Sequence, residues 1–336
     1  MAKTDLPEIA PGLKVVAIGG GNGLSTLLSG LKAFVGTENG GEPRIDRLSA
    51  IVAVSDDGGS SGRLRDELHM LPPGDIRNCM VALSEDSRLL SKLFRHRFRG
   101  EGQLGGHSFG NIFLAALTQL TGDFSEAVRL SSEILASKGH IYPATMADVR
   151  LAAELDDGTI IRGETNIGHA GSRIKRLYLE PENCHPLPDA MTAIREADVI
   201  TIGPGSLFTS LLPPILVEGV ADAIAASSAV KIFICNLMTQ PGETDGFTSY
   251  RHLRTIGEYA PTVKFDYLIV NNQPISKHQH ELYAMEGAVQ IGVHGSISTK
   301  TVEGTNIVFE NLLDQGDMVR HDSAKLATLV LKCAVK

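Results

Sequence analysis

The stretch VVAIGGGNG, residues 15–23, decides the fold class of this chain. Four apolar residues with strand character run directly into glycines, and a helix-like segment begins at Leu24. A strand, a glycine turn and a helix in this order present backbone N–H groups at a helix start to an anionic ligand, most often a phosphate. Glycine suits the turn because a Cβ would block close approach and because the turn requires positive φ. We therefore predict that a nucleotide-type ligand binds at Gly19, Gly20, Gly21, Asn22 and Gly23.

Short apolar runs alternate with amphipathic helical segments over most of the chain. The runs are continuous and lack an alternating polar face, which is typical of parallel strands covered by helices on both sides. This order predicts an α/β fold with a doubly wound, mostly parallel sheet. The expected strands are Val15–Ile18, Leu48–Val54, Asp198–Ile202, Lys231–Cys235 and Tyr267–Val270. The expected helices between them are Leu24–Phe34, Pro188–Glu196 and Val220–Ser227.

The section between about residues 75 and 180 departs from this alternation. Its pattern predicts helices over Ser84–Arg97, Asn111–Leu120 and Ser125–Lys138, the last with Ser125 as its N-cap. It then predicts antiparallel strands over Val149–Leu155, Thr159–Glu164 and Ile174–Leu179. No Pro-, Gly- or Ser-rich linker sets the section apart. We expect one composite domain over residues 12–336, with its core at about 14–75 and 180–336 and an inserted helical and small antiparallel β region at about 75–180.

The composition is that of a globular protein, with 43% hydrophobic and 21% charged residues in a chain of 336 and a mean hydropathy near zero. A net charge of −8 argues against binding to nucleic acid or to anionic lipid. Four cysteines without short spacing indicate neither a zinc site nor a disulfide framework. The sequence begins with no basic-then-apolar leader and contains no apolar run long enough for a bilayer. We expect a cytoplasmic protein without membrane insertion.

An acidic, glycine-rich loop follows the second expected strand. Asp56 and Asp57 can hold a Mg²⁺ shared with ligand phosphates, or one of them can act as a base. Ser60, Ser61 and Arg63 lie in the same loop and are candidate ligand contacts. The alternative interpretation is a solvated loop with Asp57 in an Asx turn. The functional interpretation is favoured because the loop follows a strand at the same sheet edge as the first glycine turn.

Further polar and glycine-rich turns follow other strands or begin helices. In PPGDIRN (72–78), Asp75 is positioned to cap the next helix, while Arg77 opposes the helix dipole and is therefore a candidate ligand contact. In GGHSFGN (105–111), an imidazole and an amide lie near a helix start, although a lone histidine is often structural. GPGSLFTS (203–210) and NLMTQPGETDG (236–246) again offer backbone N–H groups to an anion. The candidate ligand contacts in these turns are Arg77, Asn78, His107, Asn111, Gly203, Gly205, Ser206, Asn236 and Thr239.

Several common nucleotide-binding and catalytic motifs are missing. Leu24 stands where a GxGxxG dinucleotide turn has its third glycine, which disfavours a nicotinamide dehydrogenase. GxxxxGK[ST] is absent, which argues against an ordinary ATPase or GTPase, and HExxH is absent too. Residues 58–62 match GxSxG by letter, but two acids separate them from the strand, unlike a hydrolase elbow. Arginine is dense only at residues 95–99, a helix end that is either solvated or phosphate-facing.

Six segments together closely resemble the bacterial gluconeogenesis factor family. They are GGGNGLSTLLSGLK, VSDDGGSSGRLRDEL, PPGDIRN, GGHSFGN, IGPGSLFTSLLP and CNLMTQPGETDGF, in that order. The family is part of a wider group built like 2-phospho-L-lactate transferase, an enzyme of deazaflavin cofactor assembly. The resemblance extends from about Lys14 to the C-terminal helix, and it implies a Rossmann-like three-layer α/β/α core.

Two different functions follow from the resemblance. The transferase binds a guanine nucleotide, uses a divalent cation and moves a phospholactyl group onto a deazaflavin. An acidic pair lies beside its acceptor, and Asp56 and Asp57 occupy the matching motif. The gluconeogenesis factor branch is linked to cell shape and peptidoglycan metabolism during gluconeogenic growth, and to binding of UDP-sugars such as UDP-N-acetylglucosamine. No settled catalytic activity is attached to that branch.

Under the binding hypothesis, two residues near the C-terminus gain importance. Arg320 precedes a helix whose expected N-cap is Asp322, and its guanidinium can clamp a diphosphate bidentately. A surface arginine without a ligand is the alternative. Tyr283 can stack on a base or a sugar, although a half-buried aromatic on an amphipathic helix is the commoner case.

We expect a cytoplasmic regulatory protein that binds a nucleotide sugar, with a protein partner in cell-wall synthesis and a homo-oligomeric state. The alternative is a Mg²⁺-dependent transferase that moves a phospho-linked group from a nucleotide-activated donor, with Asp56 and Asp57 near the metal or the acceptor. Mg²⁺ bound with a nucleotide is the one cofactor considered, and nucleic acid is not an expected partner.

Overall fold

The computed structural model describes residues 12–36, 44–85, 88–292 and 301–335. These residues form an eight-stranded main sheet in the order β10-β11-β9-β8-β7-β1-β2-β3. Every neighbouring pair is parallel except β10 and β11. The predicted doubly wound, mostly parallel sheet is therefore confirmed. The strands are β1 (Leu13–Gly19), β2 (Ile45–Val52), β3 (His140–Pro143), β7 (Val199–Ile202), β8 (Val230–Ile234), β9 (Tyr267–Asn271), β10 (Thr301–Val302) and β11 (Thr305–Glu310).

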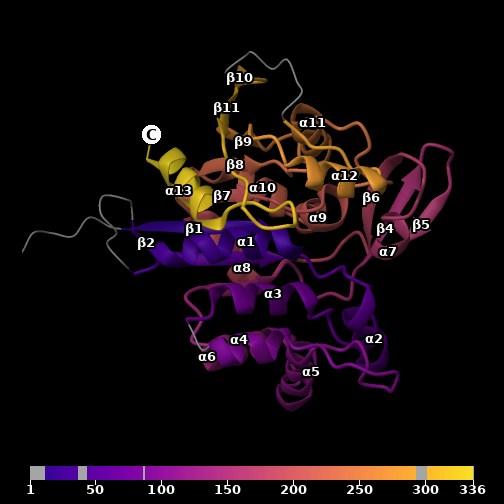
Figure 1. Cartoon of the computed structure of the whole chain (residues 1–336). Coiled ribbons are helices and arrows are strands. Elements are labelled where there is room, and N and C mark those ends of the chain that lie inside the picture. The colour runs from indigo at the N-terminus through magenta and orange to yellow at the C-terminus, as the bar shows by residue number, and fades with distance from the viewer. Residues whose placement is uncertain (1–11, 37–43, 86–87, 293–300, 336) are drawn as a thin grey trace, which may run out of the picture.

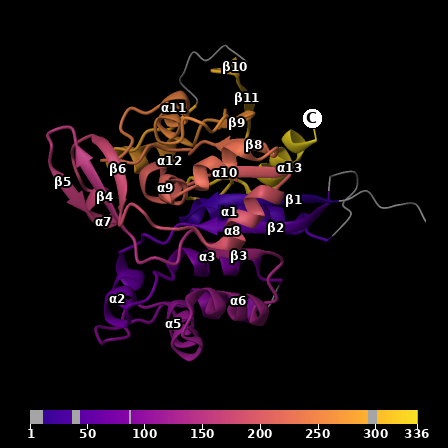
Figure 2. The ribbon, with the colours of Figure 1, turned by 180° about the vertical axis from the view of Figure 1, so that it is seen from behind.

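Helices cover both faces of this sheet. Successive residues of β1 point to opposite faces: Val15 and Ala17 are buried in one apolar cluster, and Val16 and Ile18 in the other. Figure 1 shows α1 and α13 on the near face, and Figure 2 shows α8 and α10 on the far face. The first layer contains α1 (Gly21–Leu31), α3 (Gly74–Leu83) and α13 (Ser323–Ala334). The second contains α8 (Pro188–Glu196), α9 (Leu212–Leu216), α10 (Val220–Ala226) and α11 (Ser249–Tyr259).

The middle section differs from the expected insertion at one point. Residues 75–180 contribute β3 to the main sheet, where it pairs in parallel with β2. This strand was missed because it is an edge strand of four residues that begins with an exposed histidine and ends with a proline. The helices between β2 and β3 are α2 (Gly59–Leu68), α3, α4 (Arg88–Arg95), α5 (Phe109–Thr121) and α6 (Phe124–Ile134), so the helical part begins before residue 75.

A small antiparallel sheet follows β3, as the sequence predicted. Its strands are β4 (Arg150–Leu155), β5 (Ile160–Arg162) and β6 (Ile174–Glu180), in the order β5-β4-β6. A short helix, α7 (Glu164–Ile167), lies between β5 and β6. Figures 1 and 2 show this small sheet and α7 together at one side of the molecule. A contact between Thr165 and Asp57 fixes α7 beside the loop that leaves β2.

Local boundaries differ from the predictions in physically understandable ways. The first helix begins at Gly21, three residues before the predicted start, so the glycine turn is itself the first turn of α1. α6 is capped by Asp123, which accepts from the backbone N–H of Glu126, and not by Ser125. The helix expected from Ser84 begins at Arg88, and residues 86, 87 and 336 of the predicted ranges lie outside the described residues.

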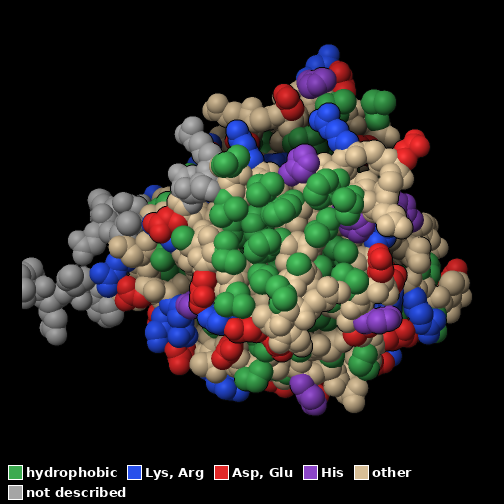
Figure 3. All heavy atoms as spheres, turned by 90° about the horizontal axis from the view of Figure 1, so that it is seen from below, with side chains coloured by type: hydrophobic (Ala, Val, Ile, Leu, Met, Phe, Trp, Pro, Cys, Tyr) green, Lys and Arg blue, Asp and Glu red, His purple; other side chains and the backbone are tan. Residues whose placement is uncertain are grey.

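One face of the added helices is apolar. Figure 3 views the molecule from the side of α4 and α5 and shows hydrophobic side chains gathered there. Leu89 and Leu93 of α4 are 78% and 40% exposed, and Leu120 of α5 is 81% exposed. Within the described ranges, no single helix is long and apolar enough to cross a membrane, although one bent pair, residues 207–216 with 220–226, meets the test by length and composition.

Candidate functional site

A cavity of about 380 Å³ lies at the carboxyl edge of the main sheet, beyond the ends of β1, β7 and β8. β1 lies between β2 and β7, the point at which the strand order reverses, and ligands of open α/β sheets bind at such a switch point. The cavity brings together many of the predicted ligand contacts from segments far apart in the chain. Those that line it are Asn22, Gly23, Gly205, Ser206, Asn236, Thr239, Tyr283 and Arg320.

The start of α1 and the loop after β7 are in close contact at this cavity. A Cβ on Gly23 would lie 2.3 Å from the carbonyl oxygen of Pro204, so only glycine fits there. Gly203 has a φ of +87°, and a Cβ on it would lie 2.6 Å from the carbonyl oxygen of Ile234. This position therefore also requires glycine. The backbone N–H of Gly205 donates to Asn236 Oδ1 at 3.0 Å and joins the loop after β7 to the loop after β8.

The first turn of α1 keeps hydrogen-bond donors available. Its N-cap, Gly20, has no side chain to cap the helix. The N–H of Gly21 donates to Asp75 Oδ2 at 2.7 Å. Among the described residues, the N–H groups of Asn22 and Gly23 have no acceptor. Both residues line the cavity, so the uncapped helix start favours an anionic ligand there.

Tyr283 and Arg320 lie on the C-terminal side of the cavity. Tyr283, on α12 (Lys277–Met285), is half-buried, and its hydroxyl accepts a hydrogen bond from the N–H of Val319 at 3.1 Å. Arg320 is exposed, and its guanidinium forms no hydrogen bond or ion pair with any residue that the structure describes. Asp322 caps α13, as predicted, and accepts from the N–H groups of the helix start.

The same cavity contains residues that sequence reasoning missed. Gln240 donates a hydrogen bond to Ser206 and so braces the two loops against each other. His321 is 8% exposed, and burial lowers the pKa of its imidazole to about 4, so the ring is neutral near pH 7. Gln240 stands within a segment already singled out and could have been found there. His321 has no local signal beyond its place beside Arg320.

Carboxylates gather beside this cavity. Glu164 on α7 is the most perturbed: burial raises the pKa of its carboxyl to about 9, and Asp56, Asp75, Asp57 and Glu243 add to the effect by repulsion. Burial also raises the pKa of Glu243 to about 7. The pKa of Asp75 rises to about 6, because of burial first and of the Asp56 charge second. Glu164 carries no recognisable sequence motif, whereas Glu243 lies in the loop after β8 that was expected to bind an anion.

The predicted acidic pair divides its contacts. Asp56 Oδ1 accepts from the N–H of Gly58 at 2.8 Å, so Asp56 forms the short-range turn that was considered for Asp57. Asp57 Oδ1 accepts from the N–H and the Oγ1 of Thr165, at 3.0 and 2.8 Å. In the described part of the chain, no group of three or more His, Cys, Asp or Glu side chains is placed to hold a metal ion. A Mg²⁺ held mainly by ligand phosphates would need only one or two of these carboxylates.

Asp75 joins two helix starts instead of capping its own helix. The prediction that it caps the following helix is wrong, because α3 begins at Gly74 and has no side-chain cap. Its carboxylate points to the N–H of Gly21, where α1 begins. A Cβ on Gly20 would lie 2.5 Å from the same carboxylate oxygen, so the glycine makes room for Asp75.

Of the other candidates, Gly19, Gly20, Gly21 and Gly203 lie at the end of β1 or in the turns after β1 and β7 and do not line the 380 Å³ cavity. The rest lie outside the cavity, among α2, α3 and α5. Ser60 Oγ lies 2.9 Å from His107 Nδ1, and Asn111 Nδ2 donates to the same oxygen at 3.1 Å. All three residues are buried. Burial lowers the pKa of His107, and the positive charge of Arg63 lowers it further. Arg63 is exposed and donates to the carbonyl of Gly105 at 2.7 Å.

Arg77 and Ser61 complete this group. The guanidinium of Arg77 donates to Ser108 Oγ at 2.5 Å and to Asn78 Oδ1 at 2.6 Å. Ser61 is buried against the start of α3, where a Cβ on Gly74 would lie 2.4 Å from its Oγ. The structure therefore separates the predicted contacts into a cavity and a neighbouring polar network.

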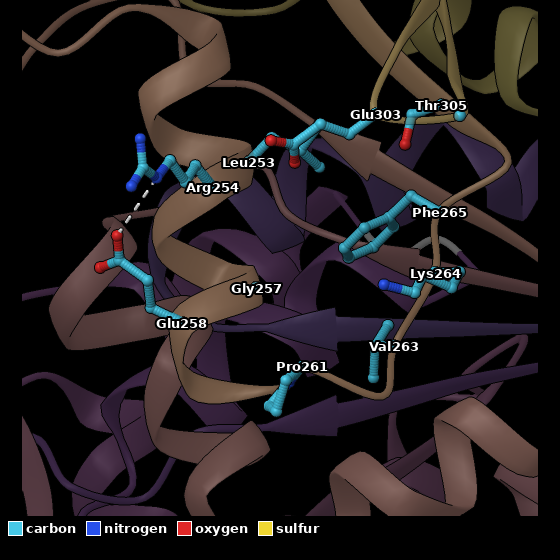
Figure 4. A pocket seen from close by; sticks show the side chains of 11 residues that line it. Leu253, Arg254, Gly257, Glu258, Pro261, Val263, Lys264, Phe265, Glu303 and Thr305 are labelled. Carbon is cyan, nitrogen blue, oxygen red and sulfur yellow. Dashed lines mark ion pairs between the residues drawn. The ribbon is translucent and has the colours of Figure 1, made fainter.

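A larger cavity of about 550 Å³ lies elsewhere, between α11, the loop before β9 and the β10–β11 turn (Figure 4). Arg254 and Glu258 form an ion pair at 3.6 Å on one wall, and Phe265 and Val263 lie on another. It contains no predicted site residue. The loop before β9 is at the amino edge of the sheet, so the carboxyl-edge cavity is the candidate functional site.

Comparisons with known proteins agree with this fold. The family model of 2-phospho-L-lactate transferase CofD matches residues 15–313. The gluconeogenesis factor of Halalkalibacterium halodurans is 45% identical over 318 residues, which cover 95% of this chain and 95% of the relative. The gluconeogenesis factor of Bacillus subtilis is 43% identical over 319 residues, which cover 95% and 97%.

A solved structure is also similar over nearly its whole length. The crystal structure of a protein from Bacillus halodurans has a TM-score of 0.88 at 44% sequence identity, and the match covers 96% of this chain and 100% of that one. The similarity in sequence and in fold thus extends over nearly the whole chain. The chain therefore belongs to the 2-phospho-L-lactate transferase CofD family, in which relatives such as these are named gluconeogenesis factors.

Proposed function

We propose that the chain binds a nucleotide-activated sugar of the UDP-N-acetylglucosamine type in the carboxyl-edge cavity. The observation that carries this proposal is that hydrogen-bond donors without an acceptor among the described residues line one cavity. They are the N–H groups of Asn22 and Gly23 and the guanidinium of Arg320. Such donors suit a diphosphate, because charge-assisted and bidentate hydrogen bonds are strong. Tyr283 supplies an aromatic ring beside them for a base or a sugar.

The role of binding is regulatory in this proposal. The names of the relatives support a function related to gluconeogenesis. We infer that the protein acts in the cytoplasm and reports the supply of nucleotide sugar to a protein partner in cell-wall synthesis. Cell shape and peptidoglycan metabolism on gluconeogenic carbon sources then depend on it. The exposed apolar face of α4 and α5 supports the expected homo-oligomer.

A second candidate is a Mg²⁺-dependent transferase, favoured by the match to the transferase family and by the acids next to the cavity. In that case Asp56 would hold the cation together with the ligand phosphates, and one acid would accept a proton from the acceptor. Glu243, with its pKa near 7, is suited to proton transfer at neutral pH. The two candidates differ in whether the ligand is returned intact.

Calorimetric titration of the full chain tests both candidates. UDP-N-acetylglucosamine, UDP, GDP and NAD are titrated with and without Mg²⁺, and each mixture is then analysed for product. We expect UDP-N-acetylglucosamine to bind and to be recovered unchanged. Turnover, or a preference for GDP with Mg²⁺, would replace the regulatory proposal by the transferase.

The Arg320→Ala variant tests the site. Loss of a charge-assisted contact should weaken binding by about 1–3 kcal/mol, roughly 5- to 150-fold in Kd. Arg254→Ala is the matched control, because Arg254 lines the cavity between α11 and the β10–β11 turn. It should bind the sugar nucleotide like the unmodified protein. An unchanged Kd for Arg320→Ala would remove the cavity from the proposal.

A further inference from the structure

Arg77 is a buried cation without a negative partner. Its side chain is only 9% exposed, at the first turn of α3. The guanidinium donates to two neutral oxygens, Ser108 Oγ and Asn78 Oδ1, and its Nε has no acceptor. Within the described ranges it forms no ion pair. Because a buried, unpaired charge destabilises a protein, its presence needs a reason.

The nearby acids do not neutralise this charge. Asp75 lies two residues earlier on α3, but its carboxylate accepts from the N–H of Gly21 at 2.7 Å. Asp56 Oδ1 accepts from the N–H of Gly58, and Asp56 Oδ2 would lie 3.0 Å from a Cβ on Gly74. Both acids act on Arg77 only at longer range, where they favour its charged form, while Arg97 and Arg95 oppose it.

Exposed arginines are anchored to the loop that precedes α5, and one of them, Arg97, acts on the charge of Arg77. Arg97 donates to the carbonyl of Gly106 at 2.6 Å, and Arg63 donates to the carbonyl of Gly105 at 2.7 Å. Both guanidinium groups are thus anchored to one loop while remaining exposed. In a chain of net charge −8, such a local gathering of arginines is unusual, and it raises the local concentration of anions.

Three helices begin in the same place. α2 and α3 have no side-chain cap, so the N–H groups of their first turns keep hydrogen-bonding capacity. The start of α5 touches both, because Asn111 donates to Ser60 on α2 and Ser108 accepts from Arg77 on α3. Helix starts that meet in this way favour an anion between them.

We propose that Arg77, the starts of α2, α3 and α5, and the exposed Arg63 and Arg97 form a second anion-binding subsite, separate from the nucleotide cavity. Its ligand is a phosphate group carried by a second small molecule. The proposal does not depend on the proposed nucleotide sugar, because no residue of this subsite lines the 380 Å³ cavity. The buried guanidinium then acquires its negative partner only when that ligand is bound.

A purely structural role for Arg77 makes the opposite prediction. Its methylene groups pack on Gly110, where a Cβ would lie 2.8 Å from Arg77 Cγ and Cδ. If packing alone explained the residue, its replacement would destabilise the protein whether or not phosphate is present. If the charge is retained for a ligand, Arg77→Met keeps the packing and removes an unpaired charge, which is neutral or stabilising without ligand.

Thermal unfolding of the full chain with inorganic phosphate and pyrophosphate at constant ionic strength tests the proposal. At ten times the Kd, either anion should raise the Tm of the unmodified protein by about 2 °C. Arg77→Met should show no such rise with inorganic phosphate, and its Tm without anion should equal or exceed that of the unmodified protein. Arg320→Ala should retain the full response to inorganic phosphate, which separates this subsite from the cavity, and should lose part of the pyrophosphate response, because the cavity donors also suit a diphosphate.

Arg65 provides the matched control. It is also a buried arginine, but it is paired with Asp148 and donates to the carbonyl of Val149. Arg65→Met should lower the Tm and leave the phosphate response intact. If Arg77→Met does not fold, Arg97→Gln, an exposed change, should halve the response or more.

The proposal is overturned by any of three results. These are no phosphate or pyrophosphate effect on the unmodified protein, an undiminished effect in Arg77→Met, and disappearance of the effect once UDP-N-acetylglucosamine saturates the cavity. The last result would assign the anion site to the far end of the same ligand. A phosphate effect that adds to that of the sugar nucleotide supports a second ligand.

Discussion

The carboxyl of Glu164 should make the stability of this protein fall as the pH rises. Its pKa is 4.5 in an unperturbed chain and about 9 in the folded protein. Between these values the folded state holds a proton that the unfolded state has released. Stability contributed by the protonated group is therefore present below about pH 4.5 and is lost progressively toward pH 9.

The size of the effect follows from the same two values. At pH 7 the unfavourable contribution of Glu164 is at most about 3 kcal/mol, and at pH 5 it is below about 1 kcal/mol. Glu164→Gln replaces the carboxyl by a neutral group of similar shape, so it should be stabilising at pH 7 and almost neutral at pH 5. For a chain of 336 residues, 3 kcal/mol corresponds to a Tm increase of about 4 °C.

The assay is calorimetric or circular-dichroism unfolding of the unmodified protein and Glu164→Gln at pH 5, 6, 7 and 8, without divalent cation. Glu101→Gln is the control, because Glu101 is exposed in the loop between α4 and α5. It should leave the Tm unchanged across this range. The reasoning is refuted if the Tm difference between Glu164→Gln and the unmodified protein is the same at pH 5 as at pH 8.

Two further predictions concern the acidic loop and the glycine turn. Asp56→Asn should change the effect of Mg²⁺ on nucleotide-sugar binding while leaving the Kd measured without Mg²⁺ within about twofold. Titrations with and without Mg²⁺ measure this. An equal loss of affinity with and without Mg²⁺ would contradict the prediction. Gly23→Ala should destabilise the protein by about 1–3 kcal/mol in denaturant unfolding and abolish ligand binding, because its Cβ would lie 2.3 Å from the Pro204 carbonyl. Gly257→Ala is the control, because it lies in α11 with no atom within 4 Å of the new Cβ, and it should be stabilising by up to about 1 kcal/mol. A similar loss of unfolding free energy in Gly23→Ala and Gly257→Ala would show that close approach is not the cause.

Much of the carboxyl-edge cavity could be predicted because parallel strands share one edge. The turn after β1 and the loops after β7 and β8 each carried glycines or small polar residues, and each lies at that edge in the structure. The residues at the far wall, Tyr283 and Arg320, were considered under the binding hypothesis, Arg320 because it precedes a helix start and Tyr283 because its ring can stack on a base or a sugar. Both line the cavity.

Other features depended on contacts that leave no local trace. β3 is four residues long, and only its pairing with β2 makes it part of the sheet. Glu164 belongs to a short helix beside the small sheet, and its pKa is raised first by burial and then by the charges of Asp56 and other acids that are distant in the sequence. No periodicity in the sequence reports such long-range packing.

The sequence by itself determined the fold class, since continuous apolar strands, glycine turns and amphipathic helices are set by local geometry and by burial on two faces. It also determined which turns are rich in glycine and small polar residues. The tertiary structure alone decided how those turns are grouped. In the strand order β2-β1-β7-β8, the loops after β7 and β8 close on the start of α1 as a cavity, and the loop after β2 turns away toward α3 and α7. Strand order and the position of the small sheet depend on packing between residues far apart in the chain. For that reason Arg320 lines the cavity and Arg77 does not, although both stand near the start of a helix.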